Sequence, residues 1–235
     1  MFQHIRKINE HSASLLLLLL LSTDFTFIVL DIINHTLGTN SSLCNIAGLC
    51  AYMLGYHLIK QFWIIILFAY LLRYTKWSGY VSWMIVFTCF LIDDALEIHQ
   101  NIGDMIADTV NGHLLQNFSL APRFFELAFL AVVGLFLLVI IAWAYFHGPP
   151  TFRKLSNDML LFFVALVFFG LIVDVAVALK LAPTIIVSLE IVEDGGESVV
   201  YSLILWDIFL LAIRNGKSDF FLHELIRENL SRHHT

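Results

Sequence analysis

The chain has 235 residues, of which 59% are hydrophobic and only 14% are charged, with a formal net charge of −6 at pH 7. Its mean hydropathy of +0.83 excludes a soluble domain, because several stretches reach the roughly 20 apolar residues that span a bilayer. The acidic balance argues against nucleic acid as a partner, since nucleic-acid binding requires a basic face.

Six apolar stretches predict six transmembrane helices. In chain order they cover residues 12–36, 49–73, 79–100, 123–146, 157–180 and 185–213. The first follows Arg6 and Lys7 as a secretion signal would, but no small-x-small cleavage site follows its leucine run. We therefore expect it to remain as an uncleaved first helix. The sequence predicts an all-α polytopic membrane protein, a bundle of six transmembrane helices whose surroundings are the lipid bilayer.

Basic residues predict the orientation of this bundle. Ten of them fall on one side: Arg6, Lys7, Arg73, Lys76, Arg153, Lys154, Arg214, Lys217, Arg227 and Arg232. Lys60, Arg123 and Lys180 lie nearer the other side. The positive-inside rule then places both termini in the cytoplasm. We expect residues 1–217 to form the six-helix transmembrane domain and residues 218–235 to form a short cytoplasmic amphipathic tail.

The last span carries four carboxylates on one helical face. Glu190, Glu193, Asp194 and Glu197 fall at i, i+3, i+4 and i+7, so they line a narrow stripe of a helix. A charged side chain in hydrocarbon costs roughly 2.5 to 3.5 kcal/mol even on lenient insertion scales. Such a stripe therefore persists only if it faces a cation, shared protons or a water-filled cavity.

Carboxylates of other spans lie at the same depth, in the outer half of the membrane. Together with the last span they number eleven: Asp24, Asp31, Asp93, Asp94, Glu97, Glu126, Asp174, Glu190, Glu193, Asp194 and Glu197. The acids of the third span share one stripe if that helix is regular. At an effective dielectric near 20, two like charges about 4 Å apart repel by about 4 kcal/mol. Some of these groups must therefore be protonated, or a divalent metal ion must supply the missing positive charge.

The predicted ligands form two tiers. The first-choice ligands are the acids of the third and last spans, Asp93, Asp94, Glu97, Glu190, Glu193 and Glu197. The second tier is Asp31, His35, His99 and Asp174. His99 lies off the acidic stripe of a regular helix, so its participation requires a bend or a partner on a neighbouring helix. Imidazole with carboxylate suits iron, manganese or zinc, whereas carboxylate alone suits calcium or magnesium, so the identity of the divalent metal stays open. The alternative without a ligand is a water-filled outer vestibule, lined by these acids, that binds nothing specific.

Two segments carry a resemblance to known proteins. Leu91-Ile-Asp-Asp-Ala-Leu-Glu-Ile-His-Gln-Asn-Ile-Gly103, taken with Glu190-x-x-Glu-Asp-Gly-Gly-Glu197, resembles a loose group of poorly characterised bacterial six-helix inner-membrane proteins. Their pattern is an Asp pair followed by His-Glu in one helix and paired acids in the last. This chain departs from it at Gln100, where an acid is expected. The resemblance implies the bacterial inner membrane as location and carries no function.

Three functions are compatible with these residues. The leading hypothesis is an acidic Asp/Glu/His cation-binding site in the outer half of the bundle. If this site is catalytic, a metal would activate water or oxygen against an apolar, lipid-soluble substrate. The second is a proton- or cation-coupled transporter or channel, which requires a polar path to the cytoplasm and finds only Asp207 there. The third is an accessory subunit whose acids pair with arginines of a membrane-complex partner, which predicts instability when the chain is expressed alone.

Overall fold

The computed structural model describes residues 2–37, 47–113, 122–178 and 182–214, and within these ranges it contains seven helices and no strand. The helices are α1 (Phe2–Leu37), α2 (Ala47–Thr75), α3 (Tyr80–Leu96), α4 (Ile98–His113), α5 (Pro122–His147), α6 (Pro150–Ala178) and α7 (Pro183–Ile213). The all-α prediction is confirmed for this part of the chain. The tail 218–235 lies outside the described residues.

Four of these helices are long and apolar enough to cross a membrane. The candidate spans are His11–Ile33, Met53–Thr75, Phe124–His147 and Ser188–Ile213, in α1, α2, α5 and α7. An integral membrane protein follows from these helices. The full set of six spans and the cytoplasmic location of the termini stay predictions.

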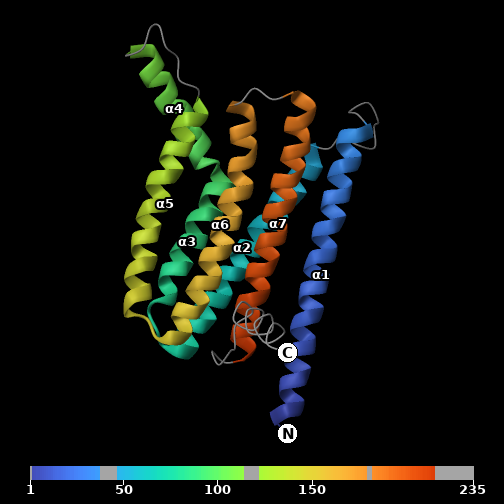
Figure 1. Cartoon of the computed structure of the whole chain (residues 1–235), viewed down its shortest axis with the longest axis vertical. Helices are drawn as coiled ribbons and strands as arrows, with labels where there is room; N and C mark the ends of the chain where they lie inside the picture. Colours follow the sequence, from blue (N-terminus) through green and yellow to red (C-terminus); the bar gives the residue numbers. More distant parts are fainter. Residues whose placement is uncertain (1, 38–46, 114–121, 179–181, 215–235) are drawn as a thin grey trace, which may run out of the picture.

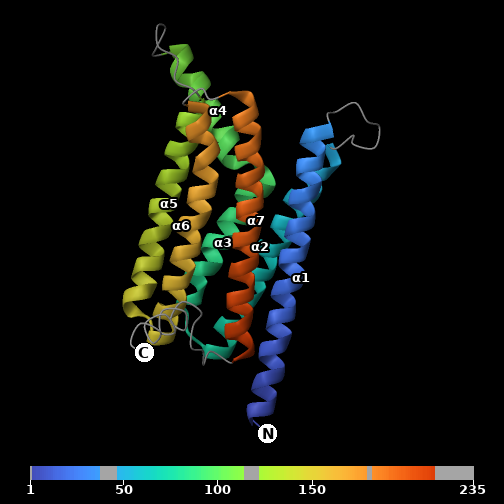
Figure 2. The same cartoon turned by 45° about the vertical axis from the view of Figure 1, so that its right-hand side comes forward.

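The central helix of the bundle is α7. It packs against α1, α2 and α6, while α2 packs against α3 and α4 against α5 (Figure 1). In α7, 56% of the apolar stretch of the candidate span is buried inside the protein, compared with 17% in each of α1 and α5. The latter two lie at opposite edges of the bundle (Figure 2), where exposed apolar side chains are stable if the surrounding solvent is lipid.

A break at Glu97 divides the third predicted span. Its backbone has φ 50° and ψ 42°, in the left-handed region, so α3 ends at Leu96 and α4 begins at Ile98. The Asp93 carboxylate accepts the backbone N–H of His99 at 3.0 Å and so caps the first turn of α4. The third span is therefore not one regular helix with one continuous acidic stripe, because the chain changes direction within it.

The two halves of the bundle differ in polarity. The half farther from the α6–α7 connection contains a tightly packed apolar core, whose members are each at most 3% exposed: Ile64, Phe68, Leu71, Tyr80, Trp83, Phe87, Phe152, Leu155, Met159, Ile204, Ile208 and Leu211. The half nearer that connection, here called the acidic half, contains the carboxylates of α3 and α7. The candidate site therefore lies between the middle of the bundle and one of its ends.

Candidate cation site

A buried ion pair occupies the middle of the bundle. The Lys60 ammonium of α2 lies 2.5 Å from Asp24 Oδ1 of α1, and both side chains are at most 1% exposed. It also donates to the carbonyl oxygen and the Oγ of Ser198, each at 2.8 Å. An ammonium has three N–H donors, so all three have acceptors here. The charge of Lys60 is therefore used on Asp24 and is not available to the acids of α3 and α7.

Two serines of α7 complete the environment of Asp24. Ser198 Oγ donates to Asp24 Oδ1 at 2.8 Å, and Ser202 Oγ donates to Oδ2 at 2.6 Å. Sequence reasoning counted Asp24 among the uncompensated carboxylates and did not consider these serines. Their i, i+4 spacing beside the acidic face of the same helix was the available signal.

Carboxylates of α3 and α7 lie between this ion pair and the end of the bundle with the α6–α7 connection. Asp94 and Glu197 interact electrostatically, and both are partly buried. Gln61 of α2 donates from Nε2 to Asp94 Oδ2 at 2.5 Å and to the Tyr201 hydroxyl at 2.9 Å. The Tyr201 phenol in turn interacts with both carboxylates. We call Gln61, Asp94, Glu197 and Tyr201 the Asp94–Glu197 cluster. It joins α2, α3 and α7.

Further acids extend from this cluster toward the α6–α7 connection. Glu193 interacts electrostatically with Glu197. Asp194 interacts with Glu190 of its own helix and with Asp31 of α1, which is buried. Carboxylates of α1, α3 and α7 thus lie within electrostatic range of one another along one side of α7.

The break at Glu97 supplies the bend that His99 requires. It brings His99 Nδ1 to 2.9 Å from Asp93 Oδ2, with side-chain exposures of 23% and 20%. The Glu97 side chain is exposed at the break itself. Of the first-choice ligands on the third span, Asp94 therefore joins Glu197, Asp93 is held by His99, and Glu97 points away from the packed interior.

Two predicted ligands, His35 and Asp174, fall outside the described side chains. Among the side chains that the structure does describe, no three of His, Cys, Asp or Glu are grouped so as to hold a metal ion. A divalent metal cofactor accordingly stays a prediction.

A separate acidic pair lies near the opposite end of α7. Asp207 and Asp158 of α6 are each 4% exposed, and Asp207 interacts electrostatically with Asp158 and with Arg214. Sequence reasoning identified Asp207 and missed Asp158, because Asp158 falls at the end of a predicted span where a charge is unremarkable. Apolar side chains, Ile64 and Ile204 among them, separate this pair from Asp24.

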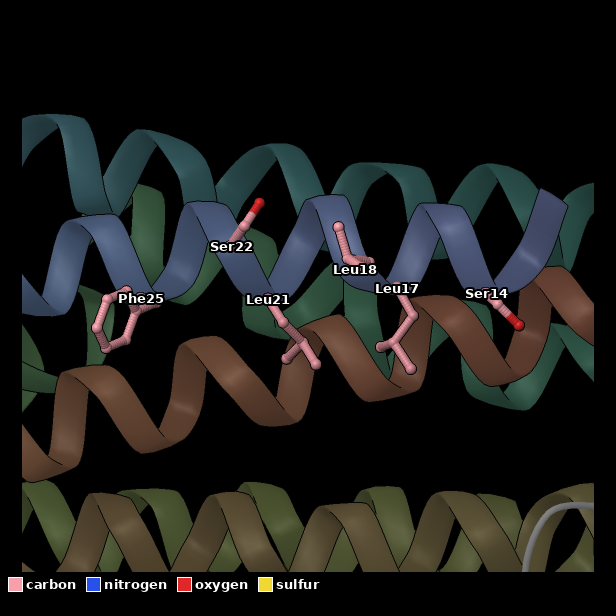
Figure 3. A pocket seen from close by; sticks show the side chains of 6 residues that line it. All are labelled: Ser14, Leu17, Leu18, Leu21, Ser22 and Phe25. Atoms are coloured by element: carbon pink, nitrogen blue, oxygen red, sulfur yellow. The ribbon is translucent and has the colours of Figure 1, made fainter. Parts of the chain in front are cut away.

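The groove on the outer face of α1 is distinct from all these groups. Its volume is about 480 Å³, and Ser14, Leu17, Leu18, Leu21, Ser22 and Phe25 line it (Figure 3). All six residues come from α1 and none carries a charge. None of the carboxylates of the acidic half lines this groove.

No family model matches the chain, and no curated protein or solved structure was found to match it. A functional conclusion therefore has to come from the geometry of the acidic half.

Proposed function

We propose that this integral membrane protein binds a cation at the Asp94–Glu197 cluster in the acidic half of its bundle. One observation carries the proposal. The partly buried carboxylates Asp94 of α3 and Glu197 of α7 interact electrostatically, while Lys60, the one fully buried ammonium of the described residues, is engaged with Asp24 and Ser198.

Electrostatics explains why a cation belongs there. Two like charges about 4 Å apart repel by about 4 kcal/mol at an effective dielectric near 20, and a hydrocarbon environment raises the cost of each isolated charge. A bound cation or a shared proton removes this repulsion. Asp194 and Asp31 add negative potential on the side of the α6–α7 connection, and so favour access of a cation from that end.

The apolar core favours a site that opens at one end. Ile64, Phe68 and Ile204 are each at most 1% exposed beneath the ion pair, and an ion passing them would be stripped of its hydration. Such a closed-ended site suits a binding protein or a membrane enzyme with an apolar substrate better than a conduit.

Elemental analysis of the detergent-purified full-length protein tests the proposal. The variants are Asp94→Asn and Glu197→Gln, with Asp108→Asn on the exposed surface of α4 as the matched control. We expect stoichiometric divalent metal in the wild type and in Asp108→Asn, and its loss in both cluster variants. If the wild type is metal-free, potentiometric titration should show proton uptake that both cluster variants reduce. A metal-free wild type that titrates like Glu197→Gln contradicts the proposal.

Transport is the second candidate, and the Asp158–Asp207 pair is the observation that favours it. This pair supplies polar groups near the opposite end of α7, where Asp207 interacts electrostatically with Arg214. In proteoliposomes with an internal pH indicator, a transporter would show cation-driven proton movement that both Asp207→Asn and Glu197→Gln abolish. No movement in the wild type would exclude this second candidate and leave the binding site in place.

A further inference from the structure

The Asp94–Glu197 cluster contains a buried oxygen that has no partner among the residues the structure describes. Gln61 is 0% exposed, and its amide nitrogen donates to both Asp94 and Tyr201, whereas its buried Oε1 accepts no hydrogen bond from the described part of the chain. An unsatisfied buried acceptor costs roughly 1 to 3 kcal/mol, and in a bilayer no bulk water relieves it. This unsatisfied oxygen therefore indicates that the cluster binds a ligand.

Asp94 determines which way the amide faces. An ionised carboxylate only accepts hydrogen bonds, so the amide turns its NH₂ group to Asp94. Oε1 is then the amide atom farther from that carboxylate. The two ends of a planar amide are about 2.2 Å apart. Since Nε2 lies 2.5 Å from Asp94 Oδ2, Oε1 lies less than about 5 Å from that oxygen. Two oxygens that bind one Ca²⁺ at 2.3 to 2.6 Å are at most about 5 Å apart.

We propose that Gln61 Oε1 is the neutral ligand of the cation bound by Asp94 and Glu197, and that this cation is Ca²⁺. The inference rests on the proposed cation site and specifies its ligand set. Two carboxylates and one dication sum to zero charge, which a membrane interior tolerates far better than a net charge. Carboxylate and amide oxygens replace the water shell of Ca²⁺ readily, whereas Mg²⁺ dehydrates reluctantly.

Two imidazoles of the described residues, His57 and His99, interact with members of the cluster. His57 precedes Gln61 by one helical turn and interacts electrostatically with Lys60 and Asp24. Its ring centroid lies 5.8 Å from that of Tyr201, and its buried Nε2 has no hydrogen-bond partner among the described residues. His99 is hydrogen bonded to Asp93. The side chains that define the cluster offer oxygen ligands, which favour a hard cation. Tighter binding of Zn²⁺ than of Ca²⁺ would show instead that His57 Nε2 joins them.

Isothermal titration of the full-length protein in detergent with Ca²⁺, Mg²⁺ and Zn²⁺ tests this assignment. The variants are Gln61→Leu and Gln61→Glu, with the exposed Gln100→Leu as the matched control. We expect the wild type to bind Ca²⁺ more tightly than Mg²⁺ or Zn²⁺. Gln61→Leu should weaken Ca²⁺ binding by at least about 10-fold, because loss of a group that merely orients a metal ligand already lowers metal affinity by about that factor. Gln100→Leu should bind as the wild type does.

Gln61→Glu separates a ligand from a residue that only positions Asp94. It keeps an oxygen at the site and adds charge, so a ligand role predicts Ca²⁺ affinity equal to or higher than that of the wild type. A positioning role predicts the opposite, because the variant loses the N–H bond to Asp94 and adds a like charge beside it. Weakening by Gln61→Glu as large as that by Gln61→Leu overturns the assignment.

The same titration separates failure of this inference from failure of the proposed site. Binding that requires Asp94 and Glu197 but is unchanged in Gln61→Leu refutes only the role of Gln61. Zn²⁺ binding tighter than Ca²⁺ binding in the wild type refutes the oxygen ligand set. This measurement uses the wild type alone, so it does not depend on the folding of any variant. Both proposals are refuted if the wild type binds no divalent cation and Asp94→Asn has no effect on proton uptake.

Discussion

At the scale of single residues, the ion pair of Lys60 with Asp24 has the largest energetic consequence. Burying two charges carries a desolvation cost that close geometry and additional hydrogen bonds must offset. Here the ammonium has three oxygen acceptors, lies 4.1 Å from the centroid of the Tyr56 ring, and Ser202 holds the second carboxylate oxygen. Each charge is compensated by the other, so removal of one leaves the other buried and unpaired.

Removing one member of this pair should therefore destabilise the protein strongly. Lys60→Met leaves Asp24 buried without its counter-ion, and we expect a loss of about 3 to 5 kcal/mol in the free energy of unfolding. Asp24→Asn combined with Lys60→Met should recover most of that loss, because no charge then remains. Chemical unfolding in detergent, followed by circular dichroism, measures both. A single variant as stable as Gln100→Leu would contradict the role assigned to the pair.

At the scale of elements, the α3–α4 break and the close contacts of α7 position the site. Gly195 of α7 lies against Ile28 of α1, where an added Cβ would be 2.9 Å from Cγ1. A Cβ on Gly196 would overlap the ring of Phe169 on α6. These two glycines let α7 approach its neighbours closely enough for its acidic face to lie inside the bundle.

The packing of Gly196 leads to a matched pair of substitutions. Gly196→Ala should destabilise the bundle by about 1 to 3 kcal/mol, since the ring of Phe169 has to move. Gly134→Ala on α5 has no atom within 4 Å of the new Cβ, and should stabilise by up to about 1 kcal/mol through helix propensity. Thermal unfolding in one detergent compares them. Equal effects at the two positions would show that α7 does not pack on α6 in this way.

The left-handed backbone of Glu97 makes a second prediction at this scale. Glycine adopts φ 50° without steric cost, so Glu97→Gly should leave the stability unchanged or raise it by up to about 1 kcal/mol. Glu97→Ile should lower it by about 1 to 2 kcal/mol, because a branched Cβ is most strained there. Thermal unfolding without added cation measures both. A loss on Glu97→Gly similar to that on Glu97→Ile would indicate a continuous helix.

At the scale of the whole molecule, polarity is divided along the bundle axis. The start of α1, the α5–α6 connection and the end of α7 lie at one end, and the α6–α7 connection lies at the other (Figure 1). The basic residues Arg73 and Arg153 lie at the first end. The positive-inside rule then predicts that the acidic half faces away from the cytoplasm.

Cysteine labelling tests this orientation. In a background without Cys44, Cys50 and Cys89, we expect Asp108→Cys on α4 to react with a membrane-impermeant maleimide added to intact cells. Thr151→Cys at the start of α6 should react only after the membrane is opened, although Thr151 is also exposed on the protein surface. The reverse pattern would invert the topology and place the cation site toward the cytoplasm.

The sequence by itself determined the helical class, the membrane environment and the acidic face of α7. Each of these follows from local periodicity and composition, which a chain displays whatever its partners are. The expectation that His99 needs a bend also came from helical geometry alone, although the location of the bend at Glu97 did not.

Only the tertiary structure decided which charges meet. Lys60 contacts Asp24 and Ser198 across 36 and 138 positions of sequence, and the role of Gln61 depends on the same arrangement. Such contacts depend on the rotation and depth of each helix relative to its neighbours. Hydropathy does not reveal either quantity, because lipid-facing and core-facing side chains of a membrane bundle are equally apolar.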